Sequence, residues 1–294
     1  MHTKEIQLIS HLDGSTHSLN VSSYPDGTPM VADPNKDSAS KGVIHRFDTL
    51  VLRPKSIDSF LTGMFVADAL EERGQQIRNL VIPFVPGARQ DRLNPVGDYL
   101  FTAKSVARMI NERKFDRVVL QDPHSTVITG LIDRAVVAPL NALFHEGNNH
   151  DMFFTNYDGI ISPDAGAGAR TREFAEFLQK IHGHGFEVVQ AFKHREVETG
   201  KLSGFEVTVQ EGKKYLVVDD ICDGGGTFVG LGQQIIKQGA KADLFVTHGI
   251  FSKGTAKLNS IFDRVVTTDS TLFEKYDSQK INTTDWIATW TRSL

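Results

Sequence analysis

The sequence predicts an α/β protein made of two similar domains, each a mainly parallel sheet flanked by helices. Short apolar runs of strand length alternate with segments of helical periodicity, which is the order that builds a parallel sheet with helices on both faces. A second series of the same kind begins near residue 150, and 294 residues are enough for two such domains. We therefore expect an N-terminal domain over residues 1–148 and a C-terminal domain over residues 149–294.

The composition excludes several classes of protein. A net charge of −4 argues against a general nucleic-acid binder. No apolar run reaches the length of a transmembrane helix, and residues 1–5 lack the apolar segment of a signal peptide. The single cysteine, Cys222, excludes an internal disulfide and fits a reducing compartment. We expect a soluble cytoplasmic protein with no nucleic-acid or membrane partner.

The first series of expected elements covers residues 5–120. Loose alternation over residues 5–10 predicts a strand, and Asp13-Gly14 predicts a tight turn that would close a hairpin. Residues 24–27, Tyr-Pro-Asp-Gly, form another expected turn. Further strands are expected at residues 49–53, 79–84 and 116–120, and helices at 59–74 and 102–113.

The second series begins after the polar stretch at residues 146–150. Strands are expected at residues 159–162, 187–192, 215–219 and 243–247, and helices at 166–182 and 228–238. Residues 200–209 predict a pair of short antiparallel strands or a flap.

The most informative stretch is residues 215–227. Its first four residues are apolar or aromatic, as in a buried central strand. A strand, a glycine-rich turn and a helix together present backbone N–H groups and a positive helix end to a phosphate. The carboxylates suit ribose hydroxyls or Mg²⁺, although an acidic connecting turn is the alternative interpretation. After the strand the residues are Asp219, Asp220, Ile221, Cys222, Asp223, Gly224, Gly225, Gly226 and Thr227.

Two polar clusters follow expected strands of the first series, at the strand ends where open α/β sheets bind ligands. The first is Arg89-Gln90-Asp91-Arg92, whose guanidinium groups suit a polyphosphate. The second contains His124, which could bind a metal or a phosphate. The alternatives are a solvated loop for the first cluster and a structural histidine for the second.

Two more clusters follow strands of the second series. Asp164, in Ser-Pro-Asp-Ala-Gly, could ligate Mg²⁺ or could cap a turn or helix. Lys193 and Arg195 could stabilise charge on a transferring phosphoryl group, or could belong to an ordinary charged loop.

The order of these clusters, together with the later Thr247-His248-Gly249 stretch, resembles the ribose-phosphate pyrophosphokinases, or PRPP synthetases. The type I phosphoribosyltransferases share only the Asp219–Thr227 loop. The resemblance implies two phosphoribosyltransferase-like domains. It also implies an enzyme that moves the β,γ-diphosphate of ATP to the C1 hydroxyl of ribose 5-phosphate, releases AMP and uses Mg²⁺.

The resemblance assigns roles to the residues that match the family motifs. Arg89, Gln90, Asp91 and His124 fall at ATP-contacting positions, and His124 and Asp164 fall at Mg²⁺ positions. Tyr24 and Asp26 match a turn that contacts adenine. In this family a neighbouring subunit can lend that turn, so the resemblance implies a homo-oligomer, at least a dimer.

The remaining motifs match the acceptor side of the family's site. Lys193 and Arg195 match the cationic pair that stabilises the transition state, and His124 is counted with them as catalytic. Asp219 and Asp220 match contacts to the ribose hydroxyls. The residues from Asp223 to Thr227, namely Asp223, Gly224, Gly225, Gly226 and Thr227, match the loop that cradles the 5-phosphate.

One departure bears on the acceptor. Gly224 stands where the family usually has Thr, so a hydroxyl donor is missing and space is expected beside the phosphate. That space favours ADP-ribose, whose phosphate carries a further substituent and whose C1-diphosphate would feed NAD synthesis. Ribose 5-phosphate is the alternative acceptor, and a catalytically silent regulatory relative is a remote alternative.

Overall fold

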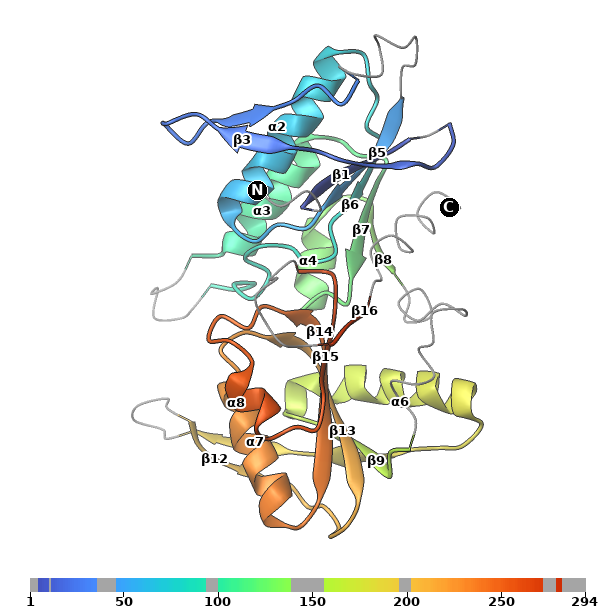
Figure 1. Cartoon of the computed structure of the whole chain (residues 1–294), viewed down its shortest axis with the longest axis vertical. Helices are drawn as coiled ribbons and strands as arrows, with labels where there is room; N and C mark the ends of the chain where they lie inside the picture. The colour runs from blue at the N-terminus through green and yellow to red at the C-terminus, as the bar shows by residue number, and fades with distance from the viewer. Residues whose placement is uncertain are drawn as a thin grey trace. The chain divides into compact units, whose positions relative to one another are not determined.

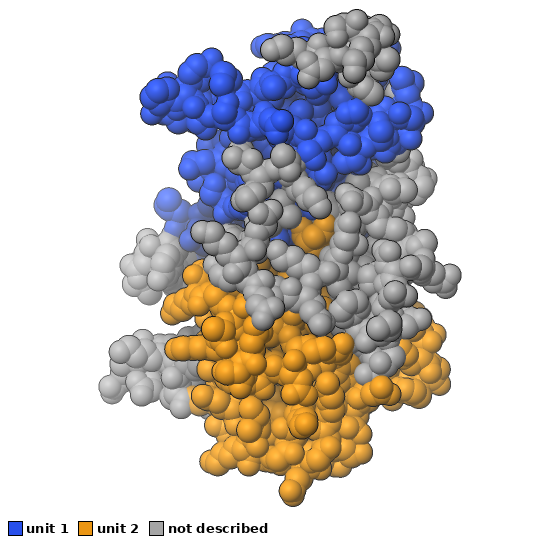
Figure 2. All heavy atoms as spheres, viewed as in Figure 1, with its two compact units in different colours: residues 1–139, 270–272, 284–294 blue, residues 140–269, 273–283 orange. Residues whose placement is uncertain are grey.

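A computed structural model of the chain describes residues 5–10, 12–35, 46–93, 100–138, 156–195, 202–271 and 279–281, with backbone alone for residues 194, 195, 202, 203 and 279–281. The chain forms two compact units, coloured separately in Figure 2. Unit 1 comprises residues 1–139, 270–272 and 284–294, and unit 2 comprises residues 140–269 and 273–283. The expected domain boundary after residue 148 lies outside the described residues.

Unit 1 is built on a six-stranded sheet in the order β2-β1-β5-β6-β7-β8 (Figure 1). Strand β1 runs antiparallel to both of its neighbours, whereas β5 to β8 are parallel. Strands β5, β6 and β7 of the parallel part are short apolar runs and are largely buried, whereas the edge strand β8 is partly exposed. The strands are β1 (Ile6–Ser10), β2 (Thr16–Ser18), β5 (Phe47–Leu52), β6 (Asn79–Val81), β7 (Arg117–Gln121) and β8 (Ala135–Ala138).

The helices of unit 1 are α2 (Ile57–Glu72), α3 (Thr102–Glu112) and the short α4 (Thr126–Leu131) among the described residues. Helix α2 begins at a capping box, in which the side chains of Ser56 and Ser59 each accept a hydrogen bond from the other residue's N–H. Apolar side chains of α2 and α3 pack with those of the sheet in one core. A separate hairpin is formed by β3 (Val21–Ser23) and β4 (Pro29–Val31).

Unit 2 contains a fully parallel six-stranded sheet in the order β10-β9-β13-β14-β15-β16. Its two longest strands, β13 and β14, lie side by side at the centre. The strands are β9 (Gly159–Ser162), β10 (Glu187–Gln190), β13 (Lys214–Cys222), β14 (Lys241–Gly249), β15 (Val265–Thr268) and β16 (Gln279–Ile281).

Helices cover both faces of this sheet. On one face Phe174 of α6 (Gly168–His182) stacks on Phe245 of β14, with ring centroids 5.3 Å apart. The opposite face packs in a core with α7 (Gly226–Lys237) and α8 (Ala256–Asn259). Figure 1 shows α6 on one side of the sheet and α7 with α8 on the other. The expectation of an α/β protein with helix-flanked parallel sheets is confirmed.

Strands β11 (Phe192–Arg195) and β12 (Leu202–Glu206) form a separate antiparallel flap. The sequence predicts one strand over residues 187–192, but the sheet strand β10 ends at Gln190. Ala191 separates it from β11, whose partner is β12 rather than the sheet. Lys193 therefore lies on a flap strand and not in a loop after a sheet strand.

Candidate active site

The glycine-rich turn connects β13 to α7. Gly225 adopts a φ of +74° and is the N-cap of α7, which begins at Gly226, two residues earlier than the sequence predicts. A left-handed backbone at this point suits glycine, because a Cβ would strain it. The first N–H groups of α7 have no partner within the helix, so the turn presents donors and a positive helix end in one place. This is the expected geometry of a phosphate-binding loop.

Two adjacent carboxylates precede the turn at the end of β13. Asp219 and Asp220 lie 3.8 and 3.7 Å from Nη1 of Arg170, which is on α6. Burial and the neighbouring charge of Asp220 raise the pKa of the Asp219 carboxyl well above its ordinary value. Hydroxyl donors or a cation at this position would therefore relieve the crowding of negative charge.

Sequence reasoning missed Arg170. It follows the Ser162–Gly168 cluster closely and is the first arginine after it. That closeness was the available signal, but the cluster alone does not say which side of the sheet α6 covers.

Lys193 reaches the loop from the flap. Its Nζ donates a hydrogen bond of 2.9 Å to Oγ1 of Thr227, the residue that ends the loop. Lys193 pairs with Phe205 in the β11–β12 ladder. The Phe205 ring comes within 2.5 Å of the position that a Cβ on Gly230 of α7 would take. The close approach of ring and helix therefore sets where the flap carries Lys193. The side chain of Arg195 lies outside the described part of the structure.

Asp164 caps the short 3₁₀ helix at residues 165–167 that precedes α6. Its Oδ1 accepts hydrogen bonds from the N–H groups of Gly166 and Ala167, at 3.0 and 3.2 Å. This is the capping role that the sequence left open as an alternative. A role in Mg²⁺ binding stays a prediction.

In unit 1 the loops after β6 and β7 lie together, because the two strands are parallel neighbours. The N–H of Gln121, the last residue of β7, donates to the carbonyl of Pro83 at 3.2 Å and so joins the end of β7 to the loop after β6. Burial alone would raise the pKa of Asp91, but Ser125, Arg92 and the charge of nearby His124 lower it below its ordinary value. The structure thus brings together two of the predicted ATP-contacting residues, Asp91 and His124.

The other predicted ATP-contacting residues have different settings. The side-chain oxygen of Gln90 accepts a hydrogen bond from the hydroxyl of Thr102, at the start of α3. Tyr24 and Asp26 lie at the tip of the β3–β4 hairpin, where the Tyr24 side chain is exposed and Asp26 accepts from the N–H of Thr28 at 2.9 Å. That hydrogen bond lowers the pKa of Asp26. An exposed tip is compatible with a role at a neighbouring subunit.

The described residues contain no group of three His, Cys, Asp or Glu side chains able to enclose a metal ion. Within the same described part of the chain, no helix has both the length and the apolar character needed to cross a membrane.

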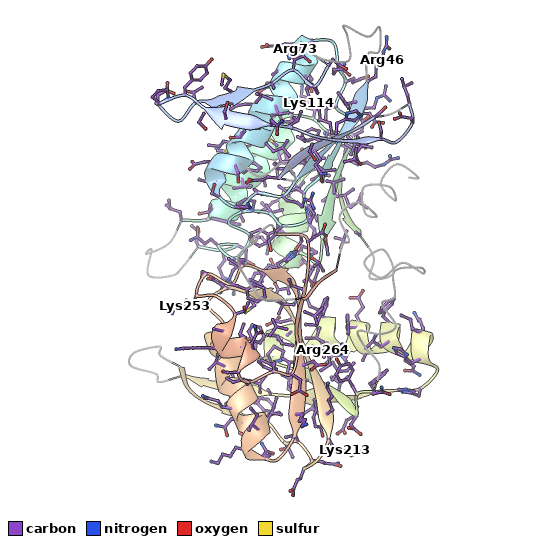
Figure 3. All side chains as sticks on the ribbon, in the orientation of Figure 1. Arg46, Arg73, Lys114, Lys213, Lys253 and Arg264 are labelled. Atoms are coloured by element: carbon purple, nitrogen blue, oxygen red, sulfur yellow. The ribbon has the colours of Figure 1, made fainter. Side chains whose placement is uncertain are left out.

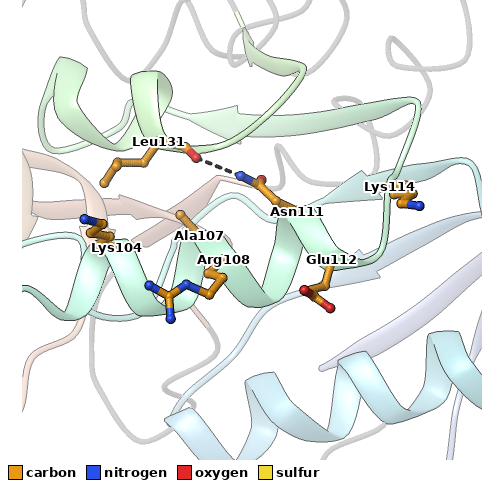
Figure 4. A pocket seen from close by; sticks show the side chains of 7 residues that line it. All are labelled: Lys104, Ala107, Arg108, Asn111, Glu112, Lys114 and Leu131. Carbon is orange, nitrogen blue, oxygen red and sulfur yellow. Dashed lines mark hydrogen bonds between the residues drawn. The ribbon is translucent and has the colours of Figure 1, made fainter.

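A cavity of about 600 Å³ lies elsewhere in unit 1, along α3 (Figure 4). Lys104 and Arg108 of α3 line it, and Asn111 Nδ2 donates to the Leu131 carbonyl at its wall, at 2.9 Å. Its lining includes none of the predicted site residues.

Comparison with known proteins places the chain. No family model matches it. A ribose-phosphate pyrophosphokinase of Cereibacter sphaeroides is 32% identical over 240 residues, which cover 76% of this chain and 67% of that protein. The chain belongs to the ribose-phosphate pyrophosphokinase family. The expectations of membership in this family and of an enzyme of its type are confirmed.

Two further relatives extend the comparison. A ribose-phosphate pyrophosphokinase of Mycoplasmopsis pulmonis is 27% identical and covers 95% of this chain and 86% of its own length. The crystal structure of phosphoribosylpyrophosphate synthetase from Mycobacterium smegmatis has the same fold, with a TM-score of 0.67 at 22% identity, over 96% of this chain and 90% of that one. The names of these proteins refer to ribose phosphate, and ADP-ribose appears in none of them.

Proposed function

We propose that this chain transfers the β,γ-diphosphate of ATP to the C1 hydroxyl of ribose 5-phosphate and releases AMP. The observation that carries the proposal is the glycine-rich loop at the start of α7, with Lys193 hydrogen-bonded to its Thr227 and two carboxylates at the end of the preceding strand. Membership in the family supports the same reaction.

Ribose 5-phosphate replaces ADP-ribose as the proposed acceptor for two reasons. The curated relatives are named for ribose phosphate. In addition, the space expected beside Gly224 contains the aliphatic stem of Lys253, whose Cδ and Cε both lie 3.5 Å from the position of a Cβ on Gly224. The room on which the ADP-ribose argument depended is therefore partly filled.

On the acceptor side, each element of the loop has a distinct role. The N–H groups at the start of α7 and the Thr227 hydroxyl would bind the 5-phosphate. Asp219 and Asp220 would accept hydrogen bonds from the ribose hydroxyls, and Arg170 limits their mutual repulsion. These contacts orient the sugar so that its C1 hydroxyl is held for attack on the β-phosphorus of ATP.

On the nucleotide side, Arg89, Gln90, Asp91 and His124 would hold ATP. Lys193 and Arg195 would stabilise the negative charge that the transferring diphosphate carries in the transition state. Mg²⁺, held by His124 or Asp164 together with phosphate oxygens, would neutralise the polyphosphate when bound.

The organisation of the whole protein is part of the proposal. We place the boundary between the two phosphoribosyltransferase-like domains after residue 148. Cytoplasmic localisation and assembly into at least a dimer, with Tyr24 and Asp26 serving a neighbouring subunit, remain predictions.

An acceptor panel tests the proposal. Purified protein is incubated with ATP, Mg²⁺ and either ribose 5-phosphate, ADP-ribose or unphosphorylated ribose, and AMP release is measured at several acceptor concentrations. We expect at least a tenfold higher kcat/KM for ribose 5-phosphate than for ADP-ribose, about 1.4 kcal/mol in transition-state binding. The reverse preference would restore ADP-ribose as the proposed acceptor. If no AMP is released with ribose 5-phosphate or with ADP-ribose, the proposed function is contradicted.

A further inference from the structure

The turn at residues 250–254, which follows β14, is fixed to the end of β13. The N–H groups of Ile250 and Phe251 both donate to the carbonyl of Cys222, at 2.9 and 3.0 Å, and the Gly254 N–H donates to the Phe251 carbonyl at 2.7 Å. Phe251 has a φ of +47°, unusual for a bulky residue, and its buried ring occupies the place of a Cβ on Gly249. The turn therefore has a defined position next to the phosphate loop.

Lys253 belongs to this turn, which connects β14 to α8, and is labelled in Figure 3. Its stem passes Gly224, the first glycine of the loop, with Cδ and Cε in van der Waals range of a Cβ at that position. The side chain is exposed, and among the described carboxylates none forms an ion pair with its ammonium group. A cation thus lies beside the loop with its charge available to a ligand.

The charges around the loop make a cation valuable there. Asp219, Asp220 and Asp223 are close in sequence to the glycines, and Arg170 is engaged by the first two. A sugar phosphate brings about two further negative charges to this end of the sheet. Lys193 reaches the far end of the loop at Thr227, while Lys253 lies at Gly224. The two lysines, from different elements, flank the segment of the loop from Gly224 to Thr227.

We propose that Lys253 binds the phosphate on C5 of the acceptor ribose and supplies the donor that Gly224 lacks. An ammonium group offers three donors and a full charge, where a threonine would offer one neutral hydroxyl. The proposal rests on the proposed function, because it takes the loop to be the site of the acceptor phosphate. A ribose 5-phosphate monoester and the C5 phosphate of ADP-ribose share this chemistry, and the test separates them.

Kinetics of three variants give the first test. We expect Lys253→Ala to raise the KM for ribose 5-phosphate about tenfold or more, with kcat within threefold and the KM for ATP within twofold of wild type. Lys253→Arg should recover most of the loss, because it keeps the charge. The matched control is Lys241→Ala, an exposed lysine at the start of β14, which should change neither KM. A KM for ribose 5-phosphate unchanged in Lys253→Ala would overturn the proposal.

A compensating substitution tests whether Lys253 replaces the missing hydroxyl. The backbone of Gly224 is outside the left-handed region, so a threonine can adopt it. In the Lys253→Ala background, Gly224→Thr should recover part of the affinity for ribose 5-phosphate, because the space beside residue 224 is then open. In the wild type, Gly224→Thr should give no such gain, since its side chain would compete with the lysine stem. If Gly224→Thr changes the affinity for ribose 5-phosphate equally in the wild type and in Lys253→Ala, Lys253 does not replace the missing hydroxyl.

Binding measured without turnover separates this inference from the proposed function. Calorimetric titration with ribose 5-phosphate, ADP-ribose and unphosphorylated ribose is carried out on wild type and Lys253→Ala. A loss of affinity for either phosphorylated sugar supports the proposal and shows which phosphate the lysine binds. Unchanged affinity for both overturns it, even in an active enzyme. Binding without AMP release would refute only the proposed function, and no binding by the wild type would refute both.

Discussion

Lys193 is the residue that we propose as the main catalytic cation. Its ammonium group is hydrogen-bonded to Thr227 of the loop, and in the proposed function it stabilises negative charge on the transferring diphosphate. We expect Lys193→Met to lower kcat by about a hundredfold or more and to leave ATP affinity within a few-fold, because the charge matters most in the transition state.

The measurement is steady-state AMP release, together with nucleotide binding by titration. Lys213→Met is the matched control, since that lysine pairs with Asp158 at the start of β13, away from the loop. A decrease in kcat of less than threefold in Lys193→Met would show that the catalytic cation is another residue.

We expect the ionised carboxylate of Asp219 to lower the stability of the folded protein, although the site uses this residue. Its pKa is raised by burial and by Asp220, so the folded protein binds its proton more tightly than the unfolded chain does. Its ionisation therefore destabilises the fold as pH rises above the ordinary value for aspartate. We expect Asp219→Asn to abolish most activity yet to raise stability at neutral pH by on the order of 1 kcal/mol.

Thermal unfolding at neutral and mildly acidic pH checks this prediction. The gain should shrink as pH falls towards the ordinary aspartate value, because the wild-type carboxyl is then protonated in both states. Asp158→Asn is a control of opposite sign, since hydrogen bonds from Lys213 and Lys214 lower the pKa of Asp158. A loss of stability in Asp219→Asn at neutral pH would contradict the account.

At the scale of elements, the flap and α7 are coupled through one glycine. The Phe205 ring of β12 packs where Gly230 has no side chain, and Phe205 pairs with Lys193 across the flap. Gly230→Val should push the flap away from α7 and lower kcat by on the order of tenfold, since catalytic groups tolerate little displacement. Gly204→Val on the same flap, where the space is open, is the matched control for AMP-release kinetics. Equal kcat values for the two variants would exclude this coupling.

Most elements of both sheets could be predicted from the sequence, since buried parallel strands are continuous apolar runs. The strand expected over residues 187–192 extends too far because Val188, Val189, Ala191 and Phe192 are all apolar, with Gln190 as the one polar residue among them. An apolar run does not say that the chain changes its partner at Ala191 and leaves the sheet for the flap. The strands expected from the sequence do not include β8 or β15.

At the scale of the whole molecule, unit 2 depends on a buried charge that joins distant parts of the chain. Asp243 is fully buried, and its Oδ2 accepts hydrogen bonds from Tyr157 at 2.6 Å and Arg264 at 2.8 Å, with Lys214 Nζ at 3.2 Å. Burial, and to a smaller extent the hydrogen bond to Asp243 and its charge, raise the pKa of the Tyr157 hydroxyl far above its ordinary value. The hydroxyl therefore stays protonated and acts as a donor.

We expect Asp243→Ala to destabilise unit 2 by about 3 to 5 kcal/mol, because it leaves cations and a hydroxyl without their partner. Tyr157→Phe, which removes one hydrogen bond and keeps the ring, should cost only about 1 kcal/mol. Hydrogen exchange of the backbone amides of β13 and β14, measured at increasing urea concentrations, gives both values. If Asp243→Ala lowers the free energy of unfolding by less than Tyr157→Phe does, Asp243 does not hold these strands together.

The candidate site was predictable as separate clusters but not as an assembled geometry. The sequence marks the loop, the arginine-rich cluster and His124, because each follows a strand that the sequence predicts. It does not show that Arg170 meets Asp219 and Asp220, since that contact depends on which face α6 covers. Nor does it show that Lys253 fills the space beside Gly224, which is why the acceptor inferred from the sequence alone was ADP-ribose.

Product analysis of a single reaction by ³¹P NMR tests the central claim most directly. The protein is mixed with ATP, Mg²⁺ and ribose 5-phosphate, and all phosphorus-containing products are quantified. The account predicts AMP and a ribose 5-phosphate bearing a diphosphate on C1, formed in equal amounts. ADP together with a singly phosphorylated sugar, or AMP together with free pyrophosphate and unchanged sugar, would contradict the transfer of the diphosphate as one unit to the C1 hydroxyl.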